Sequence, residues 1–174
     1  DIVEYAIGKK PDKKLVEKIA SEKEAQYRQI CLDNPEEFHL ASGVCEFLDF
    51  LKSNNVPMTI ATMSEWCNVE FYIKEFNLAK WFDVEKIAYS DGTLPGKPAP
   101  DIYYRAANNL GVRMEDCIVF EDAIAGIEAA HNAGAGEIIA VASREPLEYY
   151  KSIPYLSKII TDFHQVLPEF VKNS

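Results

Sequence analysis

From residue 42 onward, short apolar segments alternate with amphipathic helical segments, and this alternation restricts the chain to few folds. The apolar segments have strand length and lie at 56–61, 84–89, 117–120, 138–142 and 158–161. Helical patterns accompany them at 42–53, 65–76, 100–110, 123–133 and 163–172. Apolar strands that are separated by helices form a parallel sheet that helices cover on both faces. The sequence therefore predicts an α/β protein with a Rossmann-like three-layer core.

The first forty residues follow a different pattern. Pro11-Asp12 marks the start of a helix predicted over 12–31, in which apolar residues recur near helical spacing and lysines alternate with acidic residues. We expect residues 1–40 to form a helical unit of their own. Residues 41–174 then form the core, in which Ser42 is a favourable residue type for capping the first helix.

Net charge disfavours several classes of partner. The chain of 174 residues carries 18 Lys and Arg against 28 Asp and Glu, a formal net charge of −10. Such a charge argues against binding to nucleic acids or to anionic membranes, and no apolar run approaches the length of a membrane span. The four cysteines form no Cys-x-x-Cys pair, which is typical of reduced thiols in a cytoplasmic protein. We expect a cytoplasmic protein that binds neither nucleic acid nor membrane.

Two adjacent carboxylates follow the apolar segment at 117–120. Ligands of parallel α/β sheets bind beyond the carboxyl ends of the strands, so Glu121 and Asp122 stand where a site is expected. Neighbouring carboxylates repel each other, and Mg²⁺ offsets that repulsion with oxygen ligands. Alternatively, Asp122 only caps the helix at 123–133, although a cap needs no second carboxylate. Gly126, early in that helix, is expected to permit close packing beside the site.

Lys97 stands in a stiff segment ahead of a predicted helix. Pro98 and Pro100 disfavour helical geometry at the residues before them, so the segment stays extended until the helix at 100–110 begins. A lysine held in this way is a suitable point charge for a phosphate group. The alternative is a solvated loop lysine without a ligand.

Hydroxyl side chains follow the apolar segment at 56–61. Thr62, Met63 and Ser64 lie where we expect the strand to turn into a helix, so unsatisfied backbone N–H groups and two hydroxyls can bind an anion there. Capping of the next helix by Ser64 is the alternative, and it is compatible with the first role.

Taken in order, three segments resemble the motifs of the haloacid dehalogenase-like hydrolases. They are Ile60-Ala61-Thr62-Met63-Ser64, Gly96-Lys97-Pro98-Ala99-Pro100-Asp101-Ile102-Tyr103 and Val119-Phe120-Glu121-Asp122-Ala123-Ile124-Ala125-Gly126-Ile127. The chain is most similar to the subgroup that contains β-phosphoglucomutase and small sugar-phosphate phosphatases. This resemblance implies that Thr62 binds phosphate beside Met63 and Ser64, and that Lys97 neutralises it. It also implies that Glu121 and Asp122 form the acidic pair at a Mg²⁺ site, with Asp122 favoured as the direct ligand.

The resemblance also identifies residues 1–40 as the C-terminal part of a helical cap, in which Lys23 matches a position that touches substrate phosphate in mutases. Family members begin with a strand that ends in Asp-x-Asp-x-Thr/Val, whose first Asp attacks phosphorus. This chain lacks that segment, and Asp1 follows no apolar strand that could replace it. Glu65 and Trp66 stand where β-phosphoglucomutase has Lys and Asn, which argues against a mutase.

We therefore expect this chain to be most of a Mg²⁺-dependent phosphomonoesterase that acts on a small sugar-phosphate-like metabolite. Its nucleophilic Asp would lie in an N-terminal segment outside this chain, so the 174 residues alone are expected to be inactive. One alternative is a non-catalytic phosphate- or metal-binding relative that has lost its nucleophile, and another is a mutase of the β-phosphoglucomutase type. A receiver-like or flavodoxin-like binding domain would leave Lys97 and its Gly-Lys-Pro setting unexplained.

Overall fold

The computed structural model describes residues 12–166, and the chain divides into a helical unit (residues 1–39) and a core unit (residues 40–174). The helical unit contains α2 (Lys13–Asp33), which confirms the predicted helix and extends it by two residues. Asp12 caps this helix, because its carboxylate accepts a hydrogen bond from the Leu15 N–H at 2.7 Å. Neither α2 nor any other helix within residues 12–166 is both long and apolar enough to cross a membrane.

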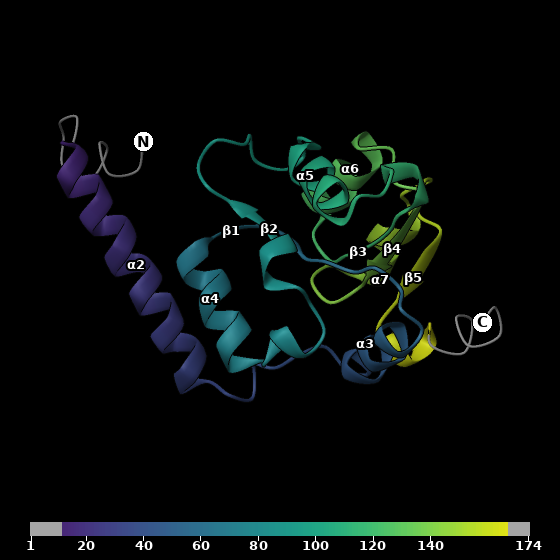
Figure 1. Cartoon of the computed structure of the whole chain (residues 1–174), viewed down its shortest axis with the longest axis horizontal. Helices are drawn as coiled ribbons and strands as arrows, with labels where there is room; N and C mark the ends of the chain where they lie inside the picture. Colours follow the sequence, from purple (N-terminus) through teal and green to yellow (C-terminus); the bar gives the residue numbers. More distant parts are fainter. Residues whose placement is uncertain (1–11, 167–174) are drawn as a thin grey trace. The chain divides into compact units, whose positions relative to one another are not determined.

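The core unit alternates strands and helices along the chain (Figure 1). Its strands are β1 (Ala61–Glu65), β2 (Ala88–Ser90), β3 (Ile118–Glu121), β4 (Glu137–Val141) and β5 (Lys158–Ile160). Its α-helices are α3 (Val44–Ser53), α4 (Trp66–Glu75), α5 (Asp101–Leu110), α6 (Ile124–Asn132) and α7 (Leu147–Lys151). The predicted α/β fold is thereby confirmed, and the short helix α7 is an addition that the sequence patterns did not indicate.

All strand pairing among the described residues is parallel. β1 pairs with β2, and β3, β4 and β5 form a separate sheet in that order. In the register of the larger sheet, Phe120 lies opposite Ile139 and Ala140 lies opposite Ile159. Within the described chain, β1 and β3 therefore belong to different sheets, although residues of both strands pack against one apolar cluster.

Helices cover both faces of the three-stranded sheet. Ile138 and Ala140 pack in a cluster with residues of α5, α6 and α7, whereas Ile139 and Val141 pack in a second cluster with residues of α3. Successive side chains of a strand point to opposite faces, so this alternation along β4 places one helical layer on each side of the sheet. In Figure 1, α5 and α6 lie above the sheet and α3 lies below it. The predicted three-layer arrangement is confirmed.

Two boundaries differ from the sequence expectation near the first strands. The ladder of β1 begins at Ala61, although the two residues before it already bond to the β2 region: the Thr59 hydroxyl donates to Lys86 O, and Ile60 O accepts from the N–H of Ala88. The predicted strand at 84–89 begins as a 3-10 turn and becomes extended at Ala88. Apolar runs predicted both strands but not where regular pairing starts.

The predicted cap of α3 is wrong. Gly43 occupies the N-cap position with φ 74°, a left-handed conformation that glycine adopts without steric cost. The carbonyl of Ser42 instead accepts a hydrogen bond from the N–H of Phe163 at 2.9 Å. Phe163 begins a 3-10 turn (Phe163–Gln165) where a closing helix at 163–172 was expected, and residues 167–172 lie outside the described residues.

Candidate active site

The carboxylates of Glu121 and Asp122 lie at the carboxyl end of β3. Glu121 is the last residue of the strand, and α6 begins at Ile124. A cavity of about 370 Å³ opens beside them at the ends of the three paired strands. Its lining residues are Ala41, Ser42, Phe120, Glu121, Asp122, Val141, Ser143, Thr161 and Phe163. The acidic pair thus lines a cavity at the sheet edge where ligands of parallel α/β sheets bind.

Lys97 and Glu121 form an ion pair that is largely shielded from solvent. Lys97 Nζ donates a hydrogen bond to Glu121 Oε2 at 2.8 Å, and the two side chains are 15% and 13% exposed. The Tyr103 hydroxyl donates to the same oxygen at 2.7 Å. Lys97 Nζ also lies 3.2 Å from Tyr103 Oη and 4.9 Å from the centre of its ring. The structure therefore brings together a predicted phosphate lysine, a predicted acidic residue and a tyrosine.

The Tyr103 phenol acts as a hydrogen-bond donor in this network. Burial, then the charge of Glu121 and the hydrogen bond to it, raise the pKa of Tyr103 far above its usual value. The hydroxyl therefore stays protonated and donates a hydrogen bond to the Glu121 carboxylate.

Gly126 is required by the close approach of Glu121. A Cβ at Gly126 would lie 2.2 Å from the Glu121 carboxyl carbon, far inside contact distance. The expected packing beside the site is thus between the backbone of α6 and a carboxylate, and any side chain at this position would displace that carboxylate.

Asp122 does not cap α6, so the capping alternative is wrong. The N-cap residue is Ala123, and it makes no side-chain cap hydrogen bond. Asp122 Oδ2 accepts a hydrogen bond from Arg144 Nε at 2.5 Å, and the backbone carbonyl of Asp122 accepts one from the Tyr150 hydroxyl at 2.8 Å. The Asp122 side chain is 35% exposed and that of Arg144 is 66% exposed. The Asp122 carboxylate therefore remains accessible from solvent.

Thr62, Met63 and Ser64 lie within β1 rather than in a turn after it. Thr62 Oγ1 accepts a hydrogen bond from the Ser64 N–H at 3.0 Å. Ser64 does not cap α4, because the N-cap residue is Glu65. Met63 packs against the apolar cluster that contains Tyr103, while neither Thr62 nor Lys97 is among the described residues that line the cavity.

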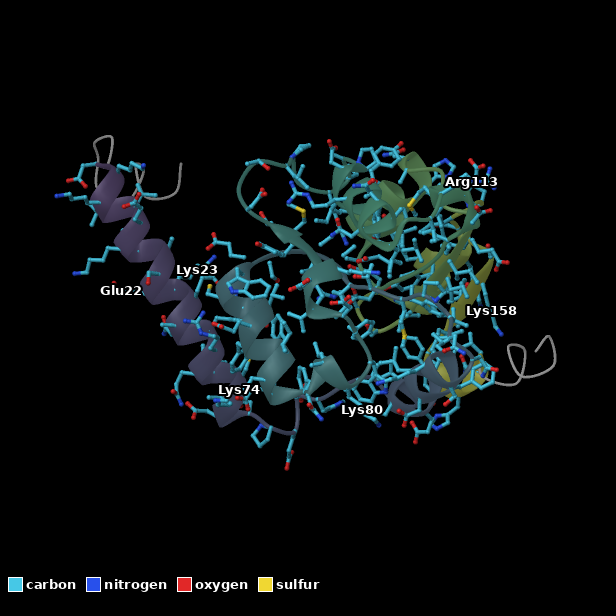
Figure 2. All side chains as sticks on the ribbon, viewed as in Figure 1. Glu22, Lys23, Lys74, Lys80, Arg113 and Lys158 are labelled. Carbon is cyan, nitrogen blue, oxygen red and sulfur yellow. The ribbon has the colours of Figure 1, made fainter. Side chains whose placement is uncertain are left out.

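Lys23, labelled in Figure 2, lies on α2 in the helical unit, whereas the residues above belong to the core unit. Its side chain is 73% exposed, and Nζ lies 2.6 Å from Glu24 Oε1.

Of the two carboxylates at the end of β3, that of Asp122 is the suitable ligand for Mg²⁺. Mg²⁺ commonly uses one or two protein carboxylates and completes its coordination with waters and phosphate oxygens. Glu121 already accepts hydrogen bonds from Lys97, Tyr103 and, at 3.3 Å, the N–H of Ala123, so it is less available as a ligand. Within residues 12–166, no group of three or more His, Cys, Asp and Glu side chains could hold a metal ion. Further ligands would have to come from water, phosphate or residues beyond this range.

Tyr103 and Arg144 are site residues that sequence reasoning missed. Tyr103 belongs to the second motif, but no local spacing indicates that its hydroxyl reaches the end of β3. Arg144 follows the predicted strand at 138–142, and that position beyond a strand end was the available signal.

Parallel strands between helical layers define an α/β protein, and a shielded lysine–carboxylate pair at one strand end marks its candidate site. A family model described as haloacid dehalogenase-like hydrolase matches residues 3–134, and the chain belongs to this family.

Known relatives of the chain include phosphatases. It is 32% identical over 124 residues to a phosphorylated carbohydrates phosphatase of Thermotoga maritima, an alignment that covers 71% of this chain and 53% of the relative. It is 35% identical over 118 residues to the fructose-1-phosphate phosphatase YqaB of Escherichia coli, with 67% and 58% covered. The chain thus spans a little over half the length of these curated relatives.

A solved structure is similar over nearly the whole chain. A haloacid dehalogenase-type hydrolase of family IA, variant 3, from Entamoeba histolytica matches with a TM-score of 0.85 and 38% identity. The match covers 98% of this chain and 75% of that one.

Proposed function

We propose that this chain is part of a cytoplasmic, Mg²⁺-dependent phosphomonoesterase that hydrolyses small sugar-phosphate-like metabolites. The observation that carries the proposal is the shielded Lys97–Glu121 pair at the carboxyl end of β3, in a chain of the haloacid dehalogenase-like family. The relatives that are phosphatases of phosphorylated carbohydrates and of fructose 1-phosphate support the substrate class.

Lys97 is the proposed phosphate-binding cation. Of its three N–H donors, Glu121 and Tyr103 engage two in the described structure, which leaves a third for a phosphate oxygen. Thr62 accepts from the Ser64 N–H, so its own hydroxyl proton is available to a second phosphate oxygen. Lys23, on a helix that we assign to a cap, is a further proposed contact to a substrate phosphate.

Asp122 is the residue proposed to hold Mg²⁺, with Glu121 beside it. A bound Mg²⁺ supplies electrostatic stabilisation to the negative charge of the transferring phosphoryl group. The Lys97 ammonium adds to that stabilisation, and its hydrogen bond of 2.8 Å from Nζ to Glu121 Oε2 sets its position.

The proposed nucleophile is an Asp outside this chain. Its carboxylate oxygen would attack phosphorus while the bond to the sugar oxygen breaks, and that oxygen would take up a proton to leave as a hydroxyl. Water would then cleave the aspartyl-phosphate to give inorganic phosphate, the free carboxylate and a proton. Glu121 and Asp122 are engaged by Lys97 and Arg144, an arrangement that suits electrostatic roles better than nucleophilic attack. We therefore propose that residues 1–174 alone do not hydrolyse phosphate esters.

The proposal is tested by comparing residues 1–174 with the full-length protein in the hydrolysis of p-nitrophenyl phosphate with Mg²⁺. Turnover is expected only from the full-length protein. Within residues 12–166, β1 and β3 each pair with a neighbouring strand on one side only, so we expect residues 1–174 to aggregate or to bind another peptide or copy, which native mass spectrometry detects. Robust turnover by a lone 19.7 kDa species would refute the external nucleophile.

Two other outcomes correspond to the alternatives. A full-length protein that binds orthophosphate but hydrolyses no ester is a non-catalytic relative. Phosphoryl transfer between two hydroxyls of a sugar phosphate, without release of phosphate, would identify a mutase.

A further inference from the structure

Tyr103 places a polar group inside an apolar cluster. It lies on α5, is 4% exposed and packs among residues such as Ile102 and Val119. Phenylalanine would fill the same space, so packing alone does not call for the hydroxyl. The hydroxyl does have a specific partner, because it donates to Glu121 Oε2 at 2.7 Å.

The Glu121 carboxylate is confined on two sides. Its Oε2 accepts from both Tyr103 and Lys97, at 2.7 and 2.8 Å. On the other side, the carboxyl group occupies the space that a side chain at Gly126 would fill. The Tyr103 hydroxyl on one side and the backbone of Gly126 on the other therefore leave the Glu121 carboxylate little freedom to move. The position of the carboxylate in turn sets the position of the Lys97 ammonium that bonds to it.

We propose that Tyr103 is a positioning residue, whose hydroxyl holds Glu121 so that the Lys97 ammonium keeps one donor directed at a substrate phosphate. The inference rests on the proposed function and deepens it. The hydroxyl also shares the charge of Oε2, which leaves more of the positive charge of Lys97 for the phosphate. Without the hydroxyl, the carboxylate would depend on Lys97 alone and draw it away from the phosphate.

Tyr103→Phe in the full-length protein tests this role. We expect the dissociation constant for orthophosphate, measured by calorimetry, to rise about 3- to 10-fold, the range for losing one hydrogen bond. The KM for p-nitrophenyl phosphate should rise in parallel. Tyr104→Phe is the matched control, because Tyr104 is the next residue on α5, is 49% exposed and donates only a 3.4 Å hydrogen bond to Asn132 O. Its phosphate affinity should stay within about twofold of the wild type.

Two further variants separate positioning from other roles. Gly126→Ala pushes the Glu121 carboxylate from the opposite side and should also weaken phosphate binding, even if Tyr103→Phe folds poorly. In a Glu121→Gln background, Tyr103→Phe should cause no further loss, since the hydroxyl acts through the carboxylate. A hydroxyl that touches phosphate directly would cause the same loss in both backgrounds, and that result would overturn the inference.

The remaining outcomes distinguish this inference from the proposed function. If Lys97→Ala loses phosphate affinity while Tyr103→Phe and Gly126→Ala retain it within twofold, only the positioning role of Tyr103 is refuted. A lower melting temperature of Tyr103→Phe with unchanged affinity of the folded protein would likewise assign the hydroxyl to stability. If Lys97→Ala itself keeps its affinity, the proposed function fails.

Discussion

Replacing Lys97 by alanine in the full-length protein should weaken the binding of orthophosphate strongly. The Lys97 side chain is only 15% exposed, so solvent screens its charge little. A charge-assisted hydrogen bond contributes about 1.5–3 kcal/mol, which corresponds to a dissociation constant about 10- to 150-fold higher. The variant also leaves the Glu121 carboxylate without its cation. That carboxylate then repels phosphate, so the dissociation constant should rise at least this much.

Stability must be separated from binding in this experiment. Removing one partner of a buried ion pair costs about 3–5 kcal/mol, although Tyr103 still donates to Glu121 and offsets part of that cost. The double variant Lys97→Met with Glu121→Gln removes both charges, so it should be more stable than Lys97→Ala and still bind phosphate weakly. Lys80→Ala is the control for the loss of a lysine, because Lys80, labelled in Figure 2, forms an exposed ion pair with Asp49.

Isothermal calorimetry with orthophosphate gives the affinity, and thermal unfolding followed by circular dichroism gives the stability. We expect Lys97→Ala and the double variant to bind weakly and Lys80→Ala to bind as the wild type does. A folded Lys97→Ala protein whose dissociation constant lies within twofold of the wild type would refute the reasoning and return Lys97 to a structural ion pair.

Three further variants and one control variant test metal binding and the fold. In the full-length protein, Asp122→Asn should abolish Mg²⁺-dependent hydrolysis of p-nitrophenyl phosphate, and near-normal rates would exclude Asp122 as a metal ligand. Arg144→Met should lower the half-saturating Mg²⁺ concentration about 2- to 5-fold, since an exposed ion pair that competes with the metal is worth up to about 1 kcal/mol; an unchanged value would show that the pair survives metal binding. Gly43→Ala should lower the melting temperature by several degrees, because Gly43 has a φ of 74° and because a Cβ there would lie 2.6 Å from Nδ1 of the His164 ring. Gly92→Ala, at φ 79° with no atom within 4 Å, should lose less, and equal losses would contradict the role of the contact.

The sequence alone predicted the layers of the core. Apolar runs at 117–120, 138–142 and 158–161 became β3, β4 and β5 within one residue at each end, because the middle of a strand that is covered on both faces is apolar. The helix between the first two of these runs was as clear, since its start follows a strand and its end precedes Gly134. Local pattern was sufficient where burial and secondary structure coincide.

Pattern was insufficient where distant backbone decided the local structure. Next to β1, the Thr59 hydroxyl donates to Lys86 O and Ile60 O accepts from the N–H of Ala88, and at the entry to α3 the N–H of Phe163 donates to Ser42 O. A residue such as Ser42 is suitable for a cap, but its sequence neighbours do not show which donor reaches its carbonyl.

The candidate site shows the same division between sequence and tertiary structure. Motif order alone indicated Lys97, Glu121 and Asp122 as charged residues near strand ends. Only the folded core showed that Glu121 pairs with Lys97, 24 positions away, and that Tyr103 shares the same carboxylate oxygen. Residue types and their periodicity reflect burial, which is a property of each segment, whereas the partner of a buried charge depends on how α5 and β3 meet. The sequence by itself therefore determined the strands and the longer helices of the core and which residues carry charge, and the packing of those elements decided which charges meet.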